Sequence, residues 1–318
     1  MKQQQSAWRL FLGLLVLLGG GLVAALVREP RAVAAVVAVG LVLIGWDPDT
    51  RGAFKVVAAA AGQTLRNLFM LLPFLLLVGG LGSVLAWQVG ALALEHLVKP
   101  GAGQQAQLLT SELTKLGVLT LWGIAAAPVL DAVSIYAWRH RATERSFGGA
   151  INYALNRYRR MFGPHAVSFT GISLGMSVII PGIMFGLWWA WVDAITATRD
   201  RTLDPLLKSL GRDPSARSPL QWSRVLSRGH RLRIVRAWLP YVFWYVPAAM
   251  VLVYQAEGAG FWAVLAFGTF NMLLLTVMEM AMVGLFEERL ELLAAQAEER
   301  GIGVDRGEDV DSESPKAS

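Results

Sequence analysis

Cysteine is absent from the 318-residue sequence. Disulfide bonds, thiolate nucleophiles, cysteine-ligated zinc and iron–sulfur clusters are therefore excluded for this chain. Charged residues are also scarce, at 16% of the sequence, whereas they make up about a quarter of an average soluble domain. With 55% hydrophobic residues, the chain has more apolar side chains than a water-soluble fold of this size can bury. These features favour a membrane protein.

Known catalytic motifs are missing as well. The sequence has no Walker phosphate loop and no Gly-x-Gly-x-x-Gly dinucleotide-binding fingerprint. Its histidines, His96, His140, His165 and His230, lie far apart, and none has the spacing of an HExxH-type metal ligand. The sequence therefore predicts a non-enzymatic protein with no metal site and no cofactor.

Long uncharged runs dominate the chain instead. A bilayer core about 30 Å thick requires roughly 20 apolar residues per helix, so most of these runs are long enough to span it. We expect an all-α, polytopic membrane helix bundle with about six to eight membrane segments. The uncharged runs cover residues 10–27, 32–46, 68–94, 116–130, 166–192, 237–256 and 258–278.

Charge between the runs predicts the topology. Segments 138–164 and 194–236 are both rich in arginine, which favours the cytoplasmic side, yet only the run 166–192 separates them. A helical hairpin bent at Pro181 and Gly182 would place both segments in the cytoplasm. The alternative is one span kinked at Pro181. We favour the hairpin, which also places both termini in the cytoplasm.

The arms of the expected hairpin, 166–180 and 183–197, would each reach only about 22 Å. Glycines at a spacing of four residues occur on both arms, Gly171 with Gly175 and Gly182 with Gly186. Such spacings let membrane helices approach closely, so they are compatible with two packed arms.

Two amphipathic helices are expected on the cytoplasmic face. Residues 147–162 alternate apolar and polar faces at helical spacing, which is typical of a helix in the membrane interface. Ser218, Pro219 and Gln221 form the pattern of a capping box that starts a second helix. The arginines of this region form an expected basic collar, Arg157, Arg159, Arg160, Arg224, Arg228, Arg231, Arg233 and Arg236.

The basic collar has two interpretations. Its arginines could bind anionic lipid headgroups or an acidic membrane-protein partner. They could also do no more than fix the topology. Nucleic acid is not an expected partner, since no recognition motif accompanies the basic residues.

Ionisable residues inside apolar runs are candidates for an intramembrane site. Asp131 and Glu279 both follow long uncharged stretches, each toward the cytoplasmic end of its expected span. Together with Asn271 and Thr276 they could carry a proton or coordinate a cation. Alternatively, each carboxylate reaches interfacial water or pairs with an arginine of the collar.

Three stretches indicate a family. They are Arg66 to Phe69 at the start of a long apolar run, the turn Ile179 to Ile183 after the amphipathic helix, and Ser223, Leu226 and Gly229. The chain thereby resembles bacterial YciC-like inner-membrane proteins and the membrane domain attached to some glycerophosphoryl diester phosphodiesterases. The resemblance covers about 55–290 and implies a six-helix bundle, without the phosphodiesterase domain or its activity.

The resemblance divides the chain into three parts. Residues 1–54 form an additional N-terminal transmembrane hairpin, 55–290 a YciC-like membrane domain, and 291–318 an acidic cytoplasmic tail expected to be disordered. A polar insertion around 203–218 also departs from the family pattern.

The sequence as a whole predicts a protein of the bacterial cytoplasmic membrane that acts through lipid or protein contacts, in envelope upkeep or complex assembly. The alternative is a small-solute or ion transporter that uses Asp131 and Glu279. An enzyme acting on lipid is a third hypothesis.

Overall fold

The computed structural model describes residues 48–97, 103–142, 145–176, 180–199, 202–241, 260–299 and 301–303. Within these ranges every regular element is a helix and no strand occurs. The prediction of an all-α chain is confirmed for this part of the sequence.

Three helical stretches of the described residues are long and apolar enough to cross a membrane, Leu68–His96, Leu113–Arg139 and Phe261–Glu298. They confirm the prediction of membrane helices in its general form. The larger number of expected segments is not reached in the described part of the chain. The N-terminal hairpin at 1–54 lies almost wholly outside the described residues, and so does most of 237–256.

The first membrane helix is continuous but irregular. It consists of α4 (Leu68–Leu75), the π-helical segment η1 (Leu76–Leu81) and α5 (Gly82–Leu97), and it follows α3 (Pro48–Arg66). Single π-helical turns inside longer helices are rare and often occur near functional sites.

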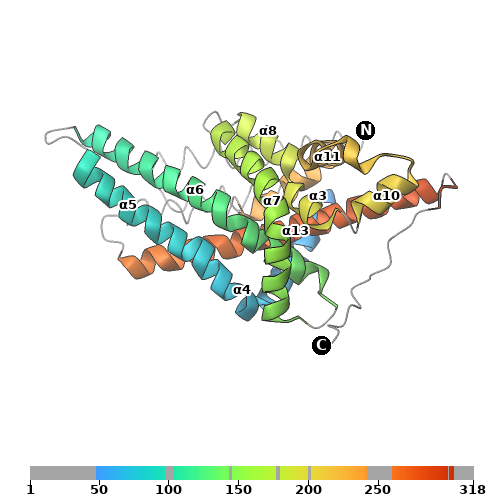
Figure 1. Cartoon of the computed structure of the whole chain (residues 1–318), viewed down its shortest axis with the longest axis horizontal. Helices are drawn as coiled ribbons and strands as arrows, with labels where there is room; N and C mark the ends of the chain where they lie inside the picture. Colours follow the sequence, from blue (N-terminus) through green and yellow to red (C-terminus); the bar gives the residue numbers. More distant parts are fainter. Residues whose placement is uncertain are drawn as a thin grey trace.

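An antiparallel partner, α6 (Gln104–Arg139), lies beside α5 along its length (Figure 1). The Trp122 indole nitrogen donates a hydrogen bond of 3.0 Å to the carbonyl of Val78 in η1. This bond ties the π-helical segment to α6 and satisfies the polar edge of the indole.

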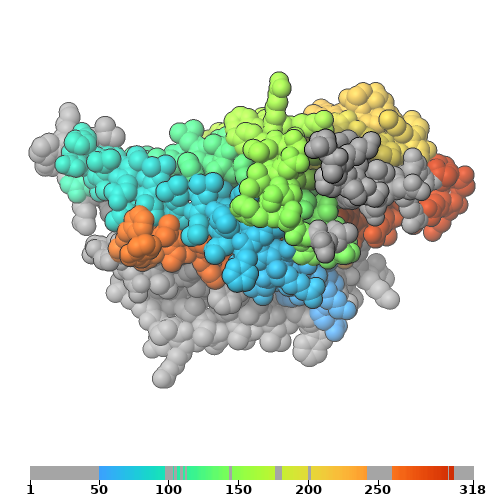
Figure 2. All heavy atoms as spheres, turned by 60° about the horizontal axis from the view of Figure 1, so that its bottom comes forward, coloured from blue at the N-terminus to red at the C-terminus, as the bar shows by residue number. Residues whose placement is uncertain are grey.

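The last membrane helix, α13 (Phe261–Glu298), packs on α3, η1 and α5. Figure 2 shows the first part of α13, in orange, on the same face as the blue and cyan α4–α5. At the crossing, a Cβ on Gly79 would collide with the Gly268 carbonyl and a Cβ on Gly268 with the Gly79 carbonyl. Both positions need glycine because the two backbones touch there.

The stretch around Pro181 could be a hairpin or one kinked span. In the structure it forms two packed helices, α7 (Phe147–Met176) and α8 (Ile180–Trp189). The ideal Cβ of Gly175 would lie 2.8 Å from the Gly182 nitrogen, so the two helices come into close contact at their connected ends. Pro181 and Gly182 lie in the first turn of α8, and residues 177–179 are outside the described part.

A single helix replaces two expected elements in α7. The amphipathic stretch 147–162 and the first arm of the hairpin run on as one helix of 30 residues, with Pro164 inside it. Proline removes a backbone donor from a helix interior, which usually kinks or ends a helix. A proline costs one bond, and the packing of α7 along α6 and α8 outweighs that loss.

Short helices cover one end of the bundle. They are α9 (Val192–Thr198), α10 (Leu203–Ser209), the 3₁₀ turn η2 (Pro214–Ala216), α11 (Pro219–Leu226) and a helical segment at 231–241. The capping box is confirmed, since Gln221 donates its backbone N–H to the Ser218 hydroxyl and accepts a bond of 3.0 Å from the Ser218 N–H.

The packed core lies where α3, α6, α9 and α13 meet. Its largest fully buried side chains include Trp191, Phe286, Ile135, Ile195 and Met280. The Trp191 and Phe286 rings are 5.9 Å apart, so they join the start of α9 to the middle of α13. This contact holds α9 against the membrane helices and thereby positions the residues described next.

Candidate functional site

Four ionisable side chains meet inside the bundle, each from a different helix. Asp131 comes from α6, His165 from α7, Asp193 from α9 and Glu279 from α13. We refer to them as the acidic–histidine site. The sequence predicted two members of this set, Asp131 and Glu279, and the structure places both beside two residues that sequence patterns had not indicated.

The His165 imidazole lies between two carboxylates. Its Nδ1 is 3.1 Å from Asp193 Oδ1 and 3.3 Å from Asp131 Oδ2. The imidazole side chain is 7% exposed and the two aspartate side chains 17% and 18% exposed, so all three are largely enclosed by protein. Stacking on Phe169, at 5.7 Å between ring centroids, fixes the plane of the imidazole.

Glu279 completes the site electrostatically. Its carboxyl group lies close enough to Asp131 and Asp193 for an electrostatic interaction with each of them. In the described part of the chain no arginine or lysine forms an ion pair with any of the three. Several carboxylates in a low-dielectric interior repel one another and lose hydration, so they require a proton or a cation between them.

Two buried polar atoms near these residues lack a hydrogen-bond partner among the described residues, His165 Nε2 and Thr276 Oγ1. Thr276 is one turn before Glu279 on α13, hence on the same side of the helix. Buried polar atoms without partners are rare in native proteins, and they mark sites where a ligand or ordered solvent satisfies them.

The spacing of the donor atoms suits a metal ion. One ligand atom from each of Asp131, His165 and Asp193 lies within 4.8 Å of the other two. Metal–ligand bonds of about 2.0–2.2 Å separate neighbouring ligand atoms by roughly 3.0–3.5 Å in tetrahedral or octahedral geometry. The observed nitrogen–oxygen distances of 3.1 Å and 3.3 Å fall in that range.

Asn271, the third predicted member of the intramembrane site, lies elsewhere. It is eight residues before Glu279, about 12 Å along the helix axis. Its side-chain oxygen accepts a hydrogen bond of 3.2 Å from the Tyr241 hydroxyl, which ties α13 to the helical segment 231–241. Asn271 therefore joins two helices and is not brought into the acidic–histidine site.

The expected basic collar divides into buried and exposed arginines. Arg157 and Arg236 are buried, at 9% and 4% exposure. The guanidinium of Arg224 lies 4.4 Å from the centre of the Trp188 ring, and that of Arg231 lies 5.9 Å from it. These four side chains contact the protein itself, so they do not form one continuous surface for a lipid.

The remaining collar arginines reach solvent to different degrees. Arg233 pairs with Glu288 of α13 at 2.7 Å, while Arg159, Arg160 and Arg228 are exposed. Burial first, and then the charges of Arg289 and Arg233, hold the pKa of His230 below its ordinary value. This end of the bundle therefore carries a positive field even after its internal pairs are formed.

Sequence reasoning missed His165 and Asp193 because they are 28 residues apart and neither lies inside an uncharged run. One signal could have found them. They flank the run 166–192, and a hairpin brings the two ends of such a run together. The expected hairpin already implied that these residues are neighbours.

Comparison with known proteins adds no relative. No family model matches the chain, and no curated protein or solved structure does. The resemblance to YciC-like proteins therefore stays a prediction, and the arguments on function rest on the geometry alone.

Proposed function

We propose that this chain is a multi-pass protein of the bacterial cytoplasmic membrane that binds and transports a divalent metal cation through the acidic–histidine site. The convergence of Asp131, His165 and Asp193 from three helices supports this proposal. It favours the ion-transporter hypothesis over a role in lipid or protein contacts alone.

The ligand set indicates the class of metal. Imidazole nitrogen suits Zn²⁺, and carboxylate oxygens suit Mn²⁺, so a mixed set of one imidazole and two carboxylates favours these two ions. A divalent ion would balance two of the three carboxylate charges. Glu279 would then either keep its negative charge or carry a proton. The site would release the ion when one of its four helices moves, since no single helix holds two ligands.

Metal binding is tested with the whole protein in detergent after chelator treatment. We expect Zn²⁺ or Mn²⁺ to raise the thermal unfolding temperature, because a ligand at 100 times its dissociation constant stabilises by about 2.7 kcal/mol. Asp131→Asn and His165→Gln should abolish the rise. The matched controls Asp213→Asn and His96→Gln change exposed residues and should retain it.

The metal-free variants give a second readout. Asp131→Asn removes one uncompensated carboxylate, so this variant should unfold at a higher temperature than the wild type in the absence of metal. A wild-type protein that binds neither Zn²⁺ nor Mn²⁺ would contradict the proposal.

Transport is tested separately in proteoliposomes with a metal-sensitive dye inside. We expect wild-type protein to admit the bound metal and Asp193→Asn to reduce the rate at least tenfold. Binding without any uptake would limit the function to metal binding and overturn the transport part.

A second candidate function is contact with lipid, as the sequence predicts. Arg159, Arg160 and Arg228 are exposed near the interface, where each basic residue adds about 1 kcal/mol of attraction to anionic lipid. We propose this attraction as an accessory to the metal site. We also propose that the chain is a member of the YciC-like family and that both of its termini lie in the cytoplasm.

A further inference from the structure

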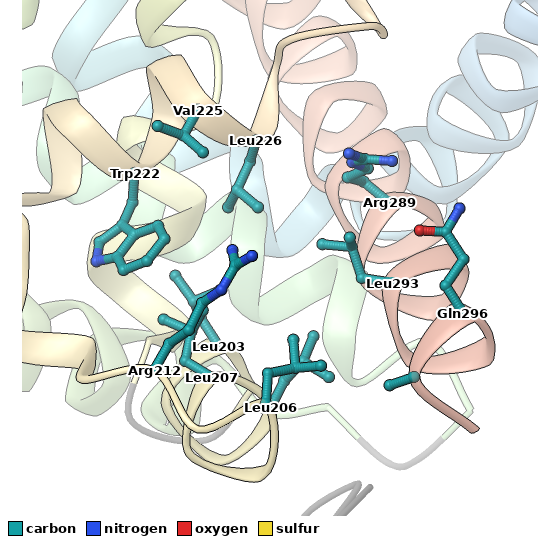
Figure 3. A pocket seen from close by; sticks show the side chains of 12 residues that line it. Leu203, Leu206, Leu207, Arg212, Trp222, Val225, Leu226, Arg289, Leu293 and Gln296 are labelled. Atoms are coloured by element: carbon teal, nitrogen blue, oxygen red, sulfur yellow. The ribbon is translucent and has the colours of Figure 1, made fainter. Parts of the chain in front are cut away.

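A cavity of about 220 Å³ opens at the polar end of the bundle, separate from the acidic–histidine site. Figure 3 shows α10 and α11 on one side of it and α13 on the other. The α13 helix, with 38 residues, is about 57 Å long, so its last turns extend past a bilayer core of about 30 Å. The cavity therefore lies where a membrane segment meets water.

One wall of the cavity is apolar. Leu203, Leu206 and Leu207 of α10 face Trp222 and Leu226 of α11, and all five are nearly or fully buried. The Trp222 indole nitrogen donates a bond of 3.1 Å to the Pro214 carbonyl, which satisfies its polar edge. The wall therefore offers carbon atoms and no unsatisfied donor.

Two guanidinium groups line the same cavity, Arg212 and Arg289. Figure 3 shows the Arg212 side chain reaching up between the leucines of α10 and Leu226, while Arg289 lies on the opposite side with Leu293 and Gln296. Neither arginine forms an ion pair within the described part of the chain. Arg289 Nε is also buried without a hydrogen-bond acceptor.

Other arginines close to the cavity do form ion pairs with acidic residues. Arg199 pairs with Asp204 at 2.8 Å, and Arg233 pairs with Glu288, the residue directly before Arg289. Asp204 and Glu288 are thus used by other arginines, and the two cations of the cavity keep their donors for an external acceptor.

Positive charge beside an apolar wall is complementary to an anion with a hydrocarbon chain. Guanidinium groups bind a carboxylate in two-point geometry, and leucine side chains bind methylene groups. Pockets for drug-sized ligands measure about 300–1,000 Å³, so this cavity accommodates one chain and not a two-chain lipid.

We propose that the cavity between α10, α11 and α13 binds the carboxylate end of a fatty acid, which Arg212 and Arg289 hold through its two oxygens. Leu203, Leu206 and Leu293 contact the first methylene groups, and the rest of the chain points out of the cavity. None of its lining residues belongs to the acidic–histidine site.

The test uses the whole protein in nanodiscs of zwitterionic lipid and a decanoate probe with a photoreactive diazirine. After irradiation, mass spectrometry should find the label on peptides that contain 203–226 or 289–297. Unlabelled decanoate should compete, whereas acetate, which lacks the chain, and decanol, which lacks the charge, should not. Equal competition by decanol would overturn the proposal.

Variants test the two arginines. Losing one charge-assisted bond should weaken competition by decanoate about tenfold or more, so Arg212→Gln and Arg289→Gln should each show this loss. Arg289→Lys keeps the charge and should recover part of the affinity. Arg51→Gln, at an exposed residue of α3 away from the cavity lining, is the matched control and should bind as the wild type does.

Decyl phosphate tests whether the cavity prefers a carboxylate or a phosphate headgroup. Competition by decyl phosphate stronger than that by decanoate would overturn the fatty-acid assignment in favour of a phosphate-bearing lipid. Labelling that is unchanged in both glutamine variants, with unchanged unfolding temperatures, would show that the arginines take no part and would likewise overturn it.

Discussion

The acidic–histidine site and the arginine-rich end treat charge in opposite ways. Inside the bundle, two carboxylates share one imidazole, and no described arginine or lysine pairs with them or with Glu279. At the polar end, cations are matched with Glu287, Glu288, Asp204 or the Trp188 ring. Water can screen a charge at the polar end, so pairing there contributes little free energy.

This difference separates buried charges, which need a bound partner, from charges at the polar end, which water can stabilise. An unmatched charge in a low-dielectric interior destabilises the fold unless a proton or a bound cation compensates it. At the wet end an unmatched charge costs less, and two arginines remain unpaired beside an apolar cavity. The following predictions test whether the two regions also differ in how they are held together.

The largest effect is expected in the membrane region at the glycine crossing. Gly79→Ala or Gly268→Ala places a Cβ against backbone that has no room to yield, which costs about 1–3 kcal/mol or more. We expect a lower unfolding temperature in detergent and loss of a single species on size exclusion.

The control for that prediction is Gly117→Ala in α6, where a Cβ meets nothing within 4 Å. Alanine is the better helix former, so this variant should be as stable as the wild type or more so. Equal stability of Gly79→Ala and Gly117→Ala would show that the crossing is loosely packed.

A smaller effect is expected at the polar end when the capping box is removed. Ser218→Ala removes the hydroxyl that accepts the Gln221 N–H and should cost about 1 kcal/mol of local stability. Hydrogen exchange of α11 amides should accelerate while α13 amides stay protected. Ser218→Asp keeps a cap and should restore the slow exchange.

The smallest effect is expected at Trp188. Trp188→Leu removes the ring faced by Arg224 and Arg231, a contact of about 0.5–1 kcal/mol for exposed cation–π pairs. Trp262→Leu, an exposed aromatic at the start of α13, is the control. A loss of unfolding temperature at Trp188→Leu as large as that at Gly79→Ala would erase the difference between the two regions.

Sequence reasoning predicted the membrane helices because apolar length alone decides them. The runs at 68–94, 116–130 and 258–278 needed no tertiary information. It did not predict that 147–162 and the next arm join into α7, because the packing that keeps Pro164 helical comes from α6 and α8.

Two of the four residues of the acidic–histidine site could be predicted from the sequence, for a similar reason. Asp131 and Glu279 stand out as charges inside apolar runs, whereas His165 and Asp193 lie at run ends, where charges are ordinary. Only the antiparallel pairing of α7 with α8, and the return of the chain into α9, brings those two ends to Asp131. The cavity with Arg212 and Arg289 also depends on α10 and α11 folding onto α13, which no local pattern shows.

The continuity of α13 links the two regions. Glu279 and Arg289 are ten residues apart on one unbroken helix, about 15 Å along its axis. A rotation or tilt of α13 as a rigid rod moves both side chains at once. Any ligand that favours one position of the rod then changes the affinity of the other site by the same factor in both directions, so a metal and a fatty acid would act as allosteric effectors of each other.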